Sequence, residues 1–241
     1  MMSNKKYYMH KAFGIGLCAL LFISQGCKKS FLDVPPQAQK PADTFWESAA
    51  DANSAVNAMY ANLHDWNNVA FAPIAVESVG SDEAEKGSTA NDASFFNNYD
   101  DFTVNSSEGQ LLGFWTGKYQ GINLANQILD NVPAIQMDGG LKARFLAEAK
   151  FVRAYHYFRL VRAFGDVPLR LKVPVDASEY NIPRSPKADV YAAIEKDLTE
   201  AAAVLPQNYS GADLGRVTKG AALALHAKVA MYQQKWADVL S

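Results

Sequence analysis

Residues 147–169 read AEAKFVRAYHYFRLVRAFGDVPL, and this stretch decides the fold. Small and aromatic residues recur in it at spacings of four and three, at Ala147, Phe151, Ala154, Phe158 and Val161. This period predicts an α-helix with a buried side, and apolar residues on a neighbouring face indicate that the helix contacts other elements on more than one side. Gly165 permits a left-handed residue after the last turn, and Pro168 prevents the helix from resuming.

Four further stretches carry the same helical period. We expect helices over about residues 48–63, 111–131, 186–205 and 218–232, with the central helix beginning near Leu141. Ser48 and Asp51 form a capping-box pattern, and Ser185 and Pro186 are expected at the N-cap and first position of their helix. The spacing of small and aromatic residues in the paired helices is like that of tetratricopeptide hairpins. The sequence therefore predicts a mainly all-α, tetratricopeptide-like helical repeat scaffold with long irregular loops.

The second predicted helix carries a glycine on every fourth residue, at Gly113, Gly117 and Gly121. Polar residues such as Lys118 and Asn126 exclude a membrane-spanning segment for this stretch. We interpret the glycines as a flat ridge that the backbone of another helix approaches closely, despite a cost of about 1 kcal/mol per glycine.

The N-terminal segment has the features of an export signal. Lysines precede an apolar block at residues 12–23, which is too short to span a membrane and has the length of a signal-peptide core. Ser24-Gln25-Gly26-Cys27 follows and resembles a bacterial lipobox, although Ser24 stands where leucine is usual. We predict a lipoprotein signal peptide over residues 1–26, lipidation of Cys27, and a proline-containing lipidated tether over residues 27–43. The alternative is ordinary secretory cleavage beside an incidental cysteine.

Composition limits the remaining chemistry. The 241 residues have a net charge of −2, and removal of residues 1–26 would take away three lysines and no acidic residue, which leaves −5. No basic cluster suited to nucleic acid remains, so we expect no nucleic-acid partner. Both cysteines, Cys18 and Cys27, precede the predicted helical domain at residues 44–241, which excludes a disulfide framework or a cysteine metal site there.

Neither a catalytic motif nor a metal motif stands out. The acidic residues Asp82, Glu83 and Glu85 are sequence neighbours, and paired glycosidase carboxylates must flank the scissile bond, so a solvated loop is favoured over a catalytic pair or a calcium site. His156 is interpreted as a hydrogen-bonded packing residue. The arginines of the central helix, Arg144, Arg153, Arg159 and Arg162, scatter around it, which favours solvated faces and inter-helix ion pairs over an anion site. We expect no catalytic residue, no metal and no cofactor.

Aromatic and amide residues stand next to one another in the long irregular connection between Ala70 and Ser107 and just before it, in Trp66-Asn67-Asn68 and Phe95-Phe96-Asn97-Asn98-Tyr99. Flat aromatic rings stack on the apolar faces of sugar rings while neighbouring amides bond the hydroxyls. The ligand-binding candidates are Trp66, Asn67, Asn68, Asn98 and Tyr99. Phe95, Phe96 and Phe102 are instead expected to pack this connection onto the helices.

Several stretches together resemble one family, the SusD/RagB-like outer-membrane nutrient-binding lipoproteins. The resemblance rests on Cys27 followed by Phe31-Leu32-Asp33 and Pro35, on Phe45-Trp46 with Asp51, on Trp115, Tyr119, Ile122 and Asn126, on Ala147-Glu148-Ala149 through Phe164-Gly165-Asp166-Val167-Pro168-Leu169, and on Gly215-Arg216 with Lys219-Gly220-Ala221. Five motifs in the family's order make the match specific. Members are generally about twice as long, and Trp236 and Val239 would lack cover in the last predicted repeat, so we expect this chain to be a truncated N-terminal half.

The resemblance implies a non-enzymatic lipoprotein that is held at the outer membrane by its N-terminal lipid and faces the cell surface. It further implies capture of oligosaccharides, or in some members other nutrients such as peptides, for import through a TonB-dependent, SusC-like transporter. The family's binding residues follow no fixed motif, so none is transferred to this sequence. Two alternatives stay open: a surface glycoside hydrolase, and a purely structural helical-repeat adaptor.

Overall fold

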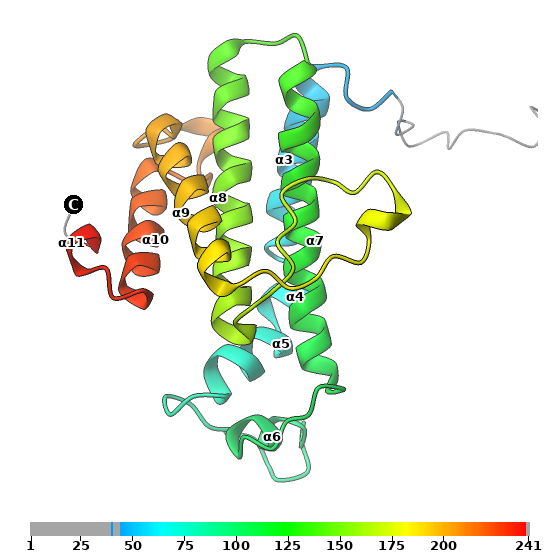
Figure 1. Cartoon of the computed structure of the whole chain (residues 1–241), viewed down its shortest axis with the longest axis vertical. Helices are drawn as coiled ribbons and strands as arrows, with labels where there is room; N and C mark the ends of the chain where they lie inside the picture. Colours follow the sequence, from blue (N-terminus) through cyan, green and yellow to red (C-terminus); the bar gives the residue numbers. More distant parts are fainter. Residues whose placement is uncertain (1–39, 41–43, 240–241) are drawn as a thin grey trace, which may run out of the picture. The chain divides into compact units, whose positions relative to one another are not determined.

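The computed structural model of the chain describes Lys40 and residues 44–239. The chain divides before Trp46, and the body that begins there is helical (Figure 1). Its described part contains five helices of at least 14 residues: α3 (Ala49–Asn62), α7 (Gly109–Asn131), α8 (Gly139–Phe164), α9 (Lys187–Val204) and α10 (Lys219–Tyr232). Among the described residues, β-pairing is limited to one isolated antiparallel bridge between Val167 and Ser185. The predicted all-α, tetratricopeptide-like scaffold is confirmed.

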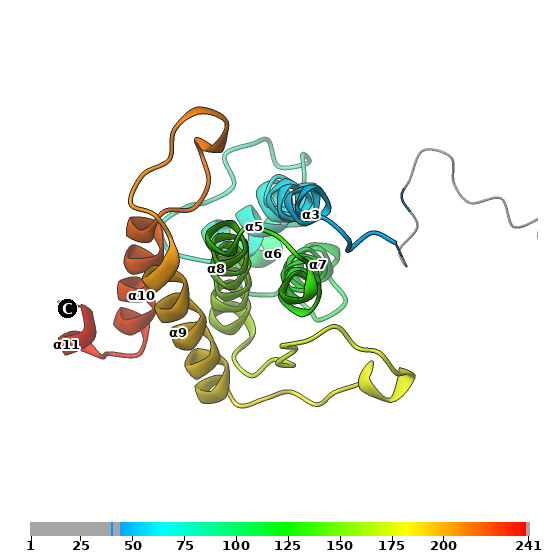
Figure 2. The same cartoon turned by 90° about the horizontal axis from the view of Figure 1, so that it is seen from above.

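Helix α8 is the centre of this body. It packs against α7 and α3 on one side and against α9 and α10 on the other, as the view along its axis shows (Figure 2). Asp138 caps its start by accepting a hydrogen bond from the backbone N–H of Leu141 at 2.8 Å. Gly165 ends it with φ of +68°. The prediction of a terminated helix with contacts on several sides is confirmed, with a start two residues before Leu141.

Apolar side chains fill both sides of α8. One cluster joins α7, α8 and α9 through residues such as Ile122, Tyr157 and Leu198, and a second joins α3, α7 and α8 through Val56, Ile128 and others. Burial of such side chains contributes roughly 1.5–3 kcal/mol each and supplies most of the helices' stability. None of the described helices is both long and apolar enough to cross a membrane.

Buried ion pairs join α8 to its neighbours. Arg153 donates two hydrogen bonds to the Asp197 carboxylate of α9, at 2.7 and 2.8 Å. The Arg159 guanidinium donates hydrogen bonds to both carboxylate oxygens of Glu77, and the Arg159 side chain is 8% exposed. The inter-helix pairing expected for these arginines is confirmed, whereas the expectation of solvated faces is wrong for Arg153 and Arg159, because their partners lie within the body.

The glycines of α7 lie at close contacts, and their partners agree with the expectation in part. A Cβ atom on Gly121 would lie 2.1 Å from Nε2 of His156, and one on Gly117 would lie 2.9 Å from Cβ of Asn67. The ridge therefore accepts a histidine side chain of α8 and the short helix α4 (Trp66–Val69). The expected close approach of another helix's backbone is present at Gly117, where the carbonyl oxygen of Asn67 would lie 3.2 Å from an added Cβ, and it is wrong at Gly121, whose partners are side chains.

Two local predictions also need correction. Pro186 is the N-cap of α9, which begins at Lys187, one residue later than expected. His156 is fully buried, yet neither ring nitrogen has a hydrogen-bond partner among the described residues. Burial, and then the charges of Lys118 and Arg159, lower the pKa of His156 to about 3, so the ring packs as a neutral group.

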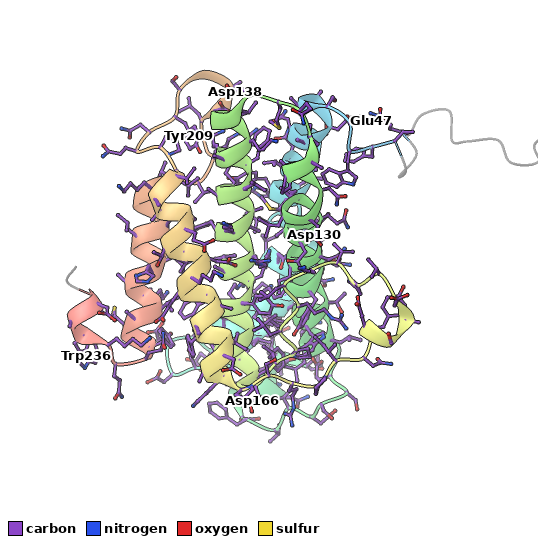
Figure 3. All side chains as sticks on the ribbon, turned by 45° about the horizontal axis from the view of Figure 1, so that its top comes forward. Glu47, Asp130, Asp138, Asp166, Tyr209 and Trp236 are labelled. Atoms are coloured by element: carbon purple, nitrogen blue, oxygen red, sulfur yellow. The ribbon has the colours of Figure 1, made fainter. Side chains whose placement is uncertain are left out.

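The remaining described elements are short. They comprise α4, α5 (Phe71–Pro73), the π-helix η1 (Ile74–Val79), α6 (Phe96–Asp100), η2 (Val132–Ala134), η3 (Ala177–Glu179), η4 (Gly211–Asp213) and α11 (Trp236–Val239). Trp236 lies on α11 at the periphery of the body (Figure 3) and is 61% exposed, in agreement with the poor cover expected for this ring.

Candidate functional site

Four aromatic rings gather where α4, α5 and α6 meet at one end of the body. The Phe71 ring lies 5.5 Å from Trp66, 5.9 Å from Phe95 and 5.6 Å from Phe96, measured between ring centroids. Phe95 and Phe96 stack at 4.7 Å. We call these four residues the aromatic cluster. Trp66 is 64% and Phe71 41% exposed, so the cluster presents apolar rings to solvent.

Local sequence builds the exposed side of this cluster. Asp65 caps α4 by accepting a hydrogen bond from the backbone N–H of Asn67 at 3.0 Å, and the exposed Trp66 is the first residue of this helix. Underneath, Phe96 and Tyr99 pack on Ala75 and Val79 of η1 in a small core of their own. The outer rings therefore rest on a packed base.

A buried lysine of α7, Lys118, holds the short helix α4 in place. The ammonium of Lys118 donates to Oδ1 of Asn68 at 2.7 Å and to the carbonyl of Asn67 at 3.3 Å. It also lies 4.2 Å from the centroid of the Phe114 ring. Burial, and then the charge of Arg159, lower the pKa of Lys118 to about 7. Lys118 thus positions the helix that carries Trp66.

A hollow of about 310 Å³ opens beside the aromatic cluster, a volume at the lower end of the range for small-ligand sites. Phe71 and Phe96 line its apolar side, and Glu85, Ser88 and Asp92 line its polar side. Lys86 holds the polar loop together by donating to the carbonyls of Thr89 and Asp92, both at 2.6 Å. The hollow combines aromatic rings with carboxylate and hydroxyl groups, which suits a polyhydroxylated ligand.

The structure separates the sequence-predicted ligand residues. Trp66 and Asn98 are exposed, whereas Asn67 is half-buried against Gly113 and Gly117 of α7. Asn68 is 5% exposed and donates to the carbonyl of Asn62 at 2.7 Å. These amides therefore do not gather around one ring.

Tyr99 is also buried, and its hydroxyl donates to the Glu108 carboxylate. Burial, followed by this bond, raises the pKa of the Tyr99 phenol above its ordinary value. The structure gives Asn68 and Tyr99 packing contacts, and ligand binding remains a proposal that centres on Trp66.

Two aromatic residues of the long connection, Phe71 and Phe102, are exposed where the sequence does not predict exposure. The sequence does not predict Phe71 as a ligand-binding residue, because its exposure follows from the way α5 meets α6 and no local pattern signals it. Phe95 and Phe96 pack as expected, but the same expectation is wrong for Phe102, which is 75% exposed with φ of +53°. A positive φ is unusual for a bulky residue and directs this ring away from the small core. The predicted lipidation site Cys27 lies outside the described residues.

Among the described residues, no group of three or more histidine, cysteine, aspartate or glutamate side chains is placed to hold a metal ion. The acidic residues Asp82, Glu83 and Glu85 lie on one exposed loop. Such neighbours do not flank a bound substrate from two sides, as the hydrolysis of a glycoside requires. The geometry at the aromatic cluster is that of a binding surface.

Comparisons with known proteins extend this assignment. The family model described as "starch-binding associating with outer membrane" matches residues 30–231. SusD-like protein P2 of Formosa agariphila is 30% identical over 219 residues, which are 89% of this chain and 42% of that protein. A solved laminarin-binding SusD-like protein matches with a TM-score of 0.72 and 32% identity, over 80% of this chain and 42% of that chain. Surface glycan-binding protein A of Bacteroides uniformis matches with a TM-score of 0.68 and 26% identity, over 78% and 43%.

The fold defines a helical-repeat protein, and the exposed rings form a candidate binding surface on it. The match over most of the chain is more specific: the chain belongs to the SusD-like family. It spans about two fifths of the length of the relatives it matches.

Proposed function

We propose that this chain captures oligosaccharides at the aromatic cluster and delivers them to a TonB-dependent, SusC-like transporter. The exposed pair of rings, Trp66 and Phe71, is the observation that supports capture. Sugar C–H faces stack on such rings. The carboxylates of the adjoining hollow can accept hydrogen bonds from sugar hydroxyls, and its serine hydroxyl can donate or accept them. Family membership and the glycan ligands named for two similar structures support the same ligand class.

A matched pair of tryptophan variants tests capture. Trp66→Ala removes a ring that is 64% exposed in the aromatic cluster, and Trp236→Ala removes one that is 61% exposed on α11. Calorimetry with laminarihexaose and maltohexaose should show binding to the unchanged chain. We expect Trp66→Ala to weaken it by roughly tenfold or more, and Trp236→Ala to leave it unchanged.

Three outcomes would contradict the proposal. Equal losses in both variants would show that Trp66 has no special part in binding. Release of reducing sugar from either oligosaccharide would favour a hydrolase. Absence of any response to a wide glycan panel would favour a structural adaptor.

We further propose that Cys27 becomes the lipid-bearing N-terminus after removal of residues 1–26, and that residues 27–43 tether the helical body to the outer membrane. Two or more acyl chains, at roughly 0.8 kcal/mol per buried CH₂, give stable anchoring. Cys27→Ala should abolish incorporation of labelled palmitate and release the protein from the membrane fraction. Retention of the label by Cys27→Ala, or purification of membranes with no transporter-sized partner, would contradict this anchoring and delivery scheme.

A further inference from the structure

Helix α7 has a second lined hollow, on the side opposite its glycines. Successive residues turn by about 100°, so Trp115, Tyr119 and Asn123 lie roughly half a turn from Gly117 and Gly121. The loop that follows α8 crosses this side, away from α3 (Figures 1 and 2). Between α7 and the loop lies a groove of about 670 Å³. It is separate from the aromatic cluster, which packs on the glycine side of α7.

Hydrogen bonds between side chains of the helices and the backbone of the loop hold the loop in place. Side chains of α7 and α8 bond the main chain of residues 168–173 in six places: Tyr119 to the carbonyl of Pro168 at 2.7 Å, Asn126 and Tyr157 to the carbonyl of Arg170 at 3.0 and 2.8 Å, the N–H of Arg170 to Tyr157 at 2.6 Å, Arg153 to the carbonyl of Leu171 at 3.0 Å, and the N–H of Val173 to Asp130 at 2.8 Å. We call these bonds the loop latch. A wall fixed in this way loses little conformational entropy when a ligand binds.

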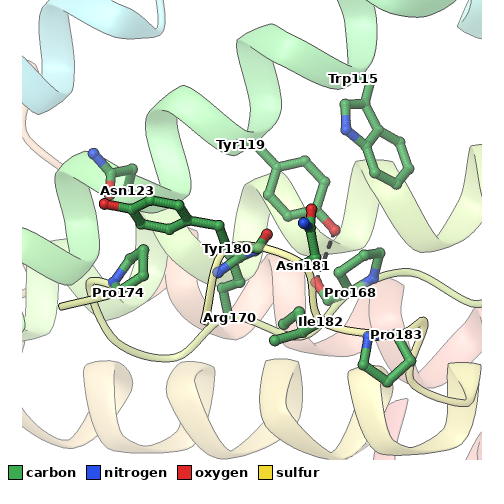
Figure 4. A pocket seen from close by; sticks show the side chains of 10 residues that line it. All are labelled: Trp115, Tyr119, Asn123, Pro168, Arg170, Pro174, Tyr180, Asn181, Ile182 and Pro183. Atoms are coloured by element: carbon green, nitrogen blue, oxygen red, sulfur yellow. Dashed lines mark hydrogen bonds between the residues drawn. The ribbon is translucent and has the colours of Figure 1, made fainter. Parts of the chain in front are cut away.

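The groove combines aromatic rings with amides. Figure 4 shows Trp115 and Tyr119 of α7 on one side and Tyr180 and Asn181 of the loop on the other. Tyr180 is 58% exposed, and Asn123 and Asn181 are also exposed. The described lining of 10 residues contains no acidic side chain. Its one cation, Arg170, donates to the backbone carbonyls of Glu179 and Tyr180. Rings and amides without a carboxylate favour an uncharged, polyhydroxylated ligand.

The groove continues into a second hollow along the same loop. A neighbouring hollow of about 600 Å³ shares Arg170, Pro174 and Ile182 with it. Each volume lies within the usual range for ligand sites. A chain-like ligand can therefore extend along the loop from the groove towards Lys172, where Asp130 and Glu179 also line the wall.

We propose that this groove, formed by Trp115, Tyr119, Asn123, Tyr180 and Asn181, is a second binding site for neutral oligosaccharides. The choice of ligand class rests on the proposed function, but the site and its residues are independent of the aromatic cluster. Two sites on opposite sides of α7 let one chain hold a long glycan at two points, or hold two glycans at once. Simultaneous engagement raises the overall affinity for a polymer above that of either site.

The four tryptophans of the chain allow each site to be observed separately. Trp66 reports on the aromatic cluster, Trp115 on the groove, and Trp236 on a distant surface. In fluorine NMR of the full chain labelled with 5-fluorotryptophan, maltohexaose or laminarihexaose should shift the Trp66 and Trp115 resonances and leave that of Trp236 in place. In Trp66→Ala, the Trp115 shift should persist.

Tyr180→Ala should weaken the sugar response of Trp115 by roughly tenfold and leave that of Trp66 unchanged. Leu112→Ala is the matched control, because Leu112 is 66% exposed on α7 and lies outside the groove lining. A Trp115 resonance that never responds while Trp66 does would overturn the second site alone. Silence of both resonances would overturn this site and the proposed function together. A response of Trp115 to a decaproline peptide and to neither sugar would assign the groove to a protein segment and overturn the proposal.

Discussion

The two sides of α7 are built on different principles. On the glycine side, backbone surface without side chains receives His156 and α4, and the fit leaves no room for one added carbon at Gly121. On the aromatic side, Trp115 and Tyr119 stay half-buried, and a loop is held at a distance by the loop latch. Close packing fills the first side, whereas hydrogen bonds keep the second side open as a groove.

This difference shows how one helix can serve as core and as binding surface. A packed side derives its stability from burial and shape, so it tolerates little change in volume. A latched side derives its shape from directional bonds to backbone atoms, so its opening depends on particular polar groups. Variants of the two sides should therefore fail in different ways.

The strongest way to break the latched side is Arg153→Met. Arg153 joins Asp197 of α9, Asn126 of α7 and the carbonyl of Leu171. Its removal leaves the Asp197 carboxylate, which is 4% exposed, buried without its cation, and we expect a loss of about 3–5 kcal/mol in the free energy of unfolding. Urea denaturation measures this loss.

The control for this variant is Lys150→Met, which breaks another α8–α9 pair. Lys150 and Glu200 approach to 2.6 Å, but their side chains are 29% and 40% exposed. Solvent screens such a pair, so the loss should stay below about 1 kcal/mol. Similar losses in the two variants would show that burial of the Arg153 pair has no special effect.

The packed side is tested by Gly121→Ala. The added Cβ would lie 2.1 Å from Nε2 of the fully buried His156 ring. We expect a loss of about 1–3 kcal/mol, measured as a lower midpoint of thermal or urea unfolding. Gly139→Ala is the control, since a Cβ there meets no atom within 4 Å. A Gly121→Ala chain as stable as the control would show that α7 and α8 can separate without cost.

The sequence predicts the packed side better than the latched one. Periodic small and aromatic residues depend only on neighbours along one helix, so α7, α8 and the glycine ridge follow from local pattern. The partner of Gly121 does not, because a histidine 35 positions later in the chain fills that space. The positions of Trp115 and Tyr119 beside a groove depend on how residues 168–183 fold back over α7, and no local signal specifies that path.

The candidate binding surface shows the same limit. Trp66 is exposed as a surface aromatic residue should be, and in the structure Asp65 caps the helix that presents it. Asn68 and Tyr99 have the same residue types as binding-site residues, yet Lys118 and Glu108 bond them inside the body. Composition predicts which groups suit a sugar, whereas tertiary contacts decide which of them remain available.

The stability of the packed side should depend on pH through His156. The pKa of His156 falls from 6.5 in the unfolded chain to about 3 in the folded one, because burial and the nearby Lys118 and Arg159 oppose protonation. Between these values the unfolded chain binds the extra proton, so stability falls as the pH drops from about 6.5 towards 3. His156→Leu should remove this contribution, which is about 3 kcal/mol at pH 4, and change stability little at pH 7.

Urea midpoints at pH 4 and pH 7 measure this effect for His156→Leu. His64→Leu is the control, because His64 is exposed at the end of α3. Parallel acid losses in the unchanged chain and in His156→Leu would exclude a neutral, buried His156 as their source.

The smallest effect is expected from Tyr119→Phe, which keeps the ring of the groove and removes one bond of the loop latch. Burial raises the pKa of the Tyr119 phenol, so its hydroxyl stays a donor to the carbonyl of Pro168 throughout the neutral range. Loss of this bond should cost about 0.5–1.5 kcal/mol. It should also speed hydrogen exchange at residues 169–173 more than in α9. Tyr191→Phe is the control, because Tyr191 is half-buried on α9 and is not part of the loop latch. Because five bonds of the latch remain, the loop should loosen without detaching, and uniform acceleration across all helices would instead place Tyr119 in the general core.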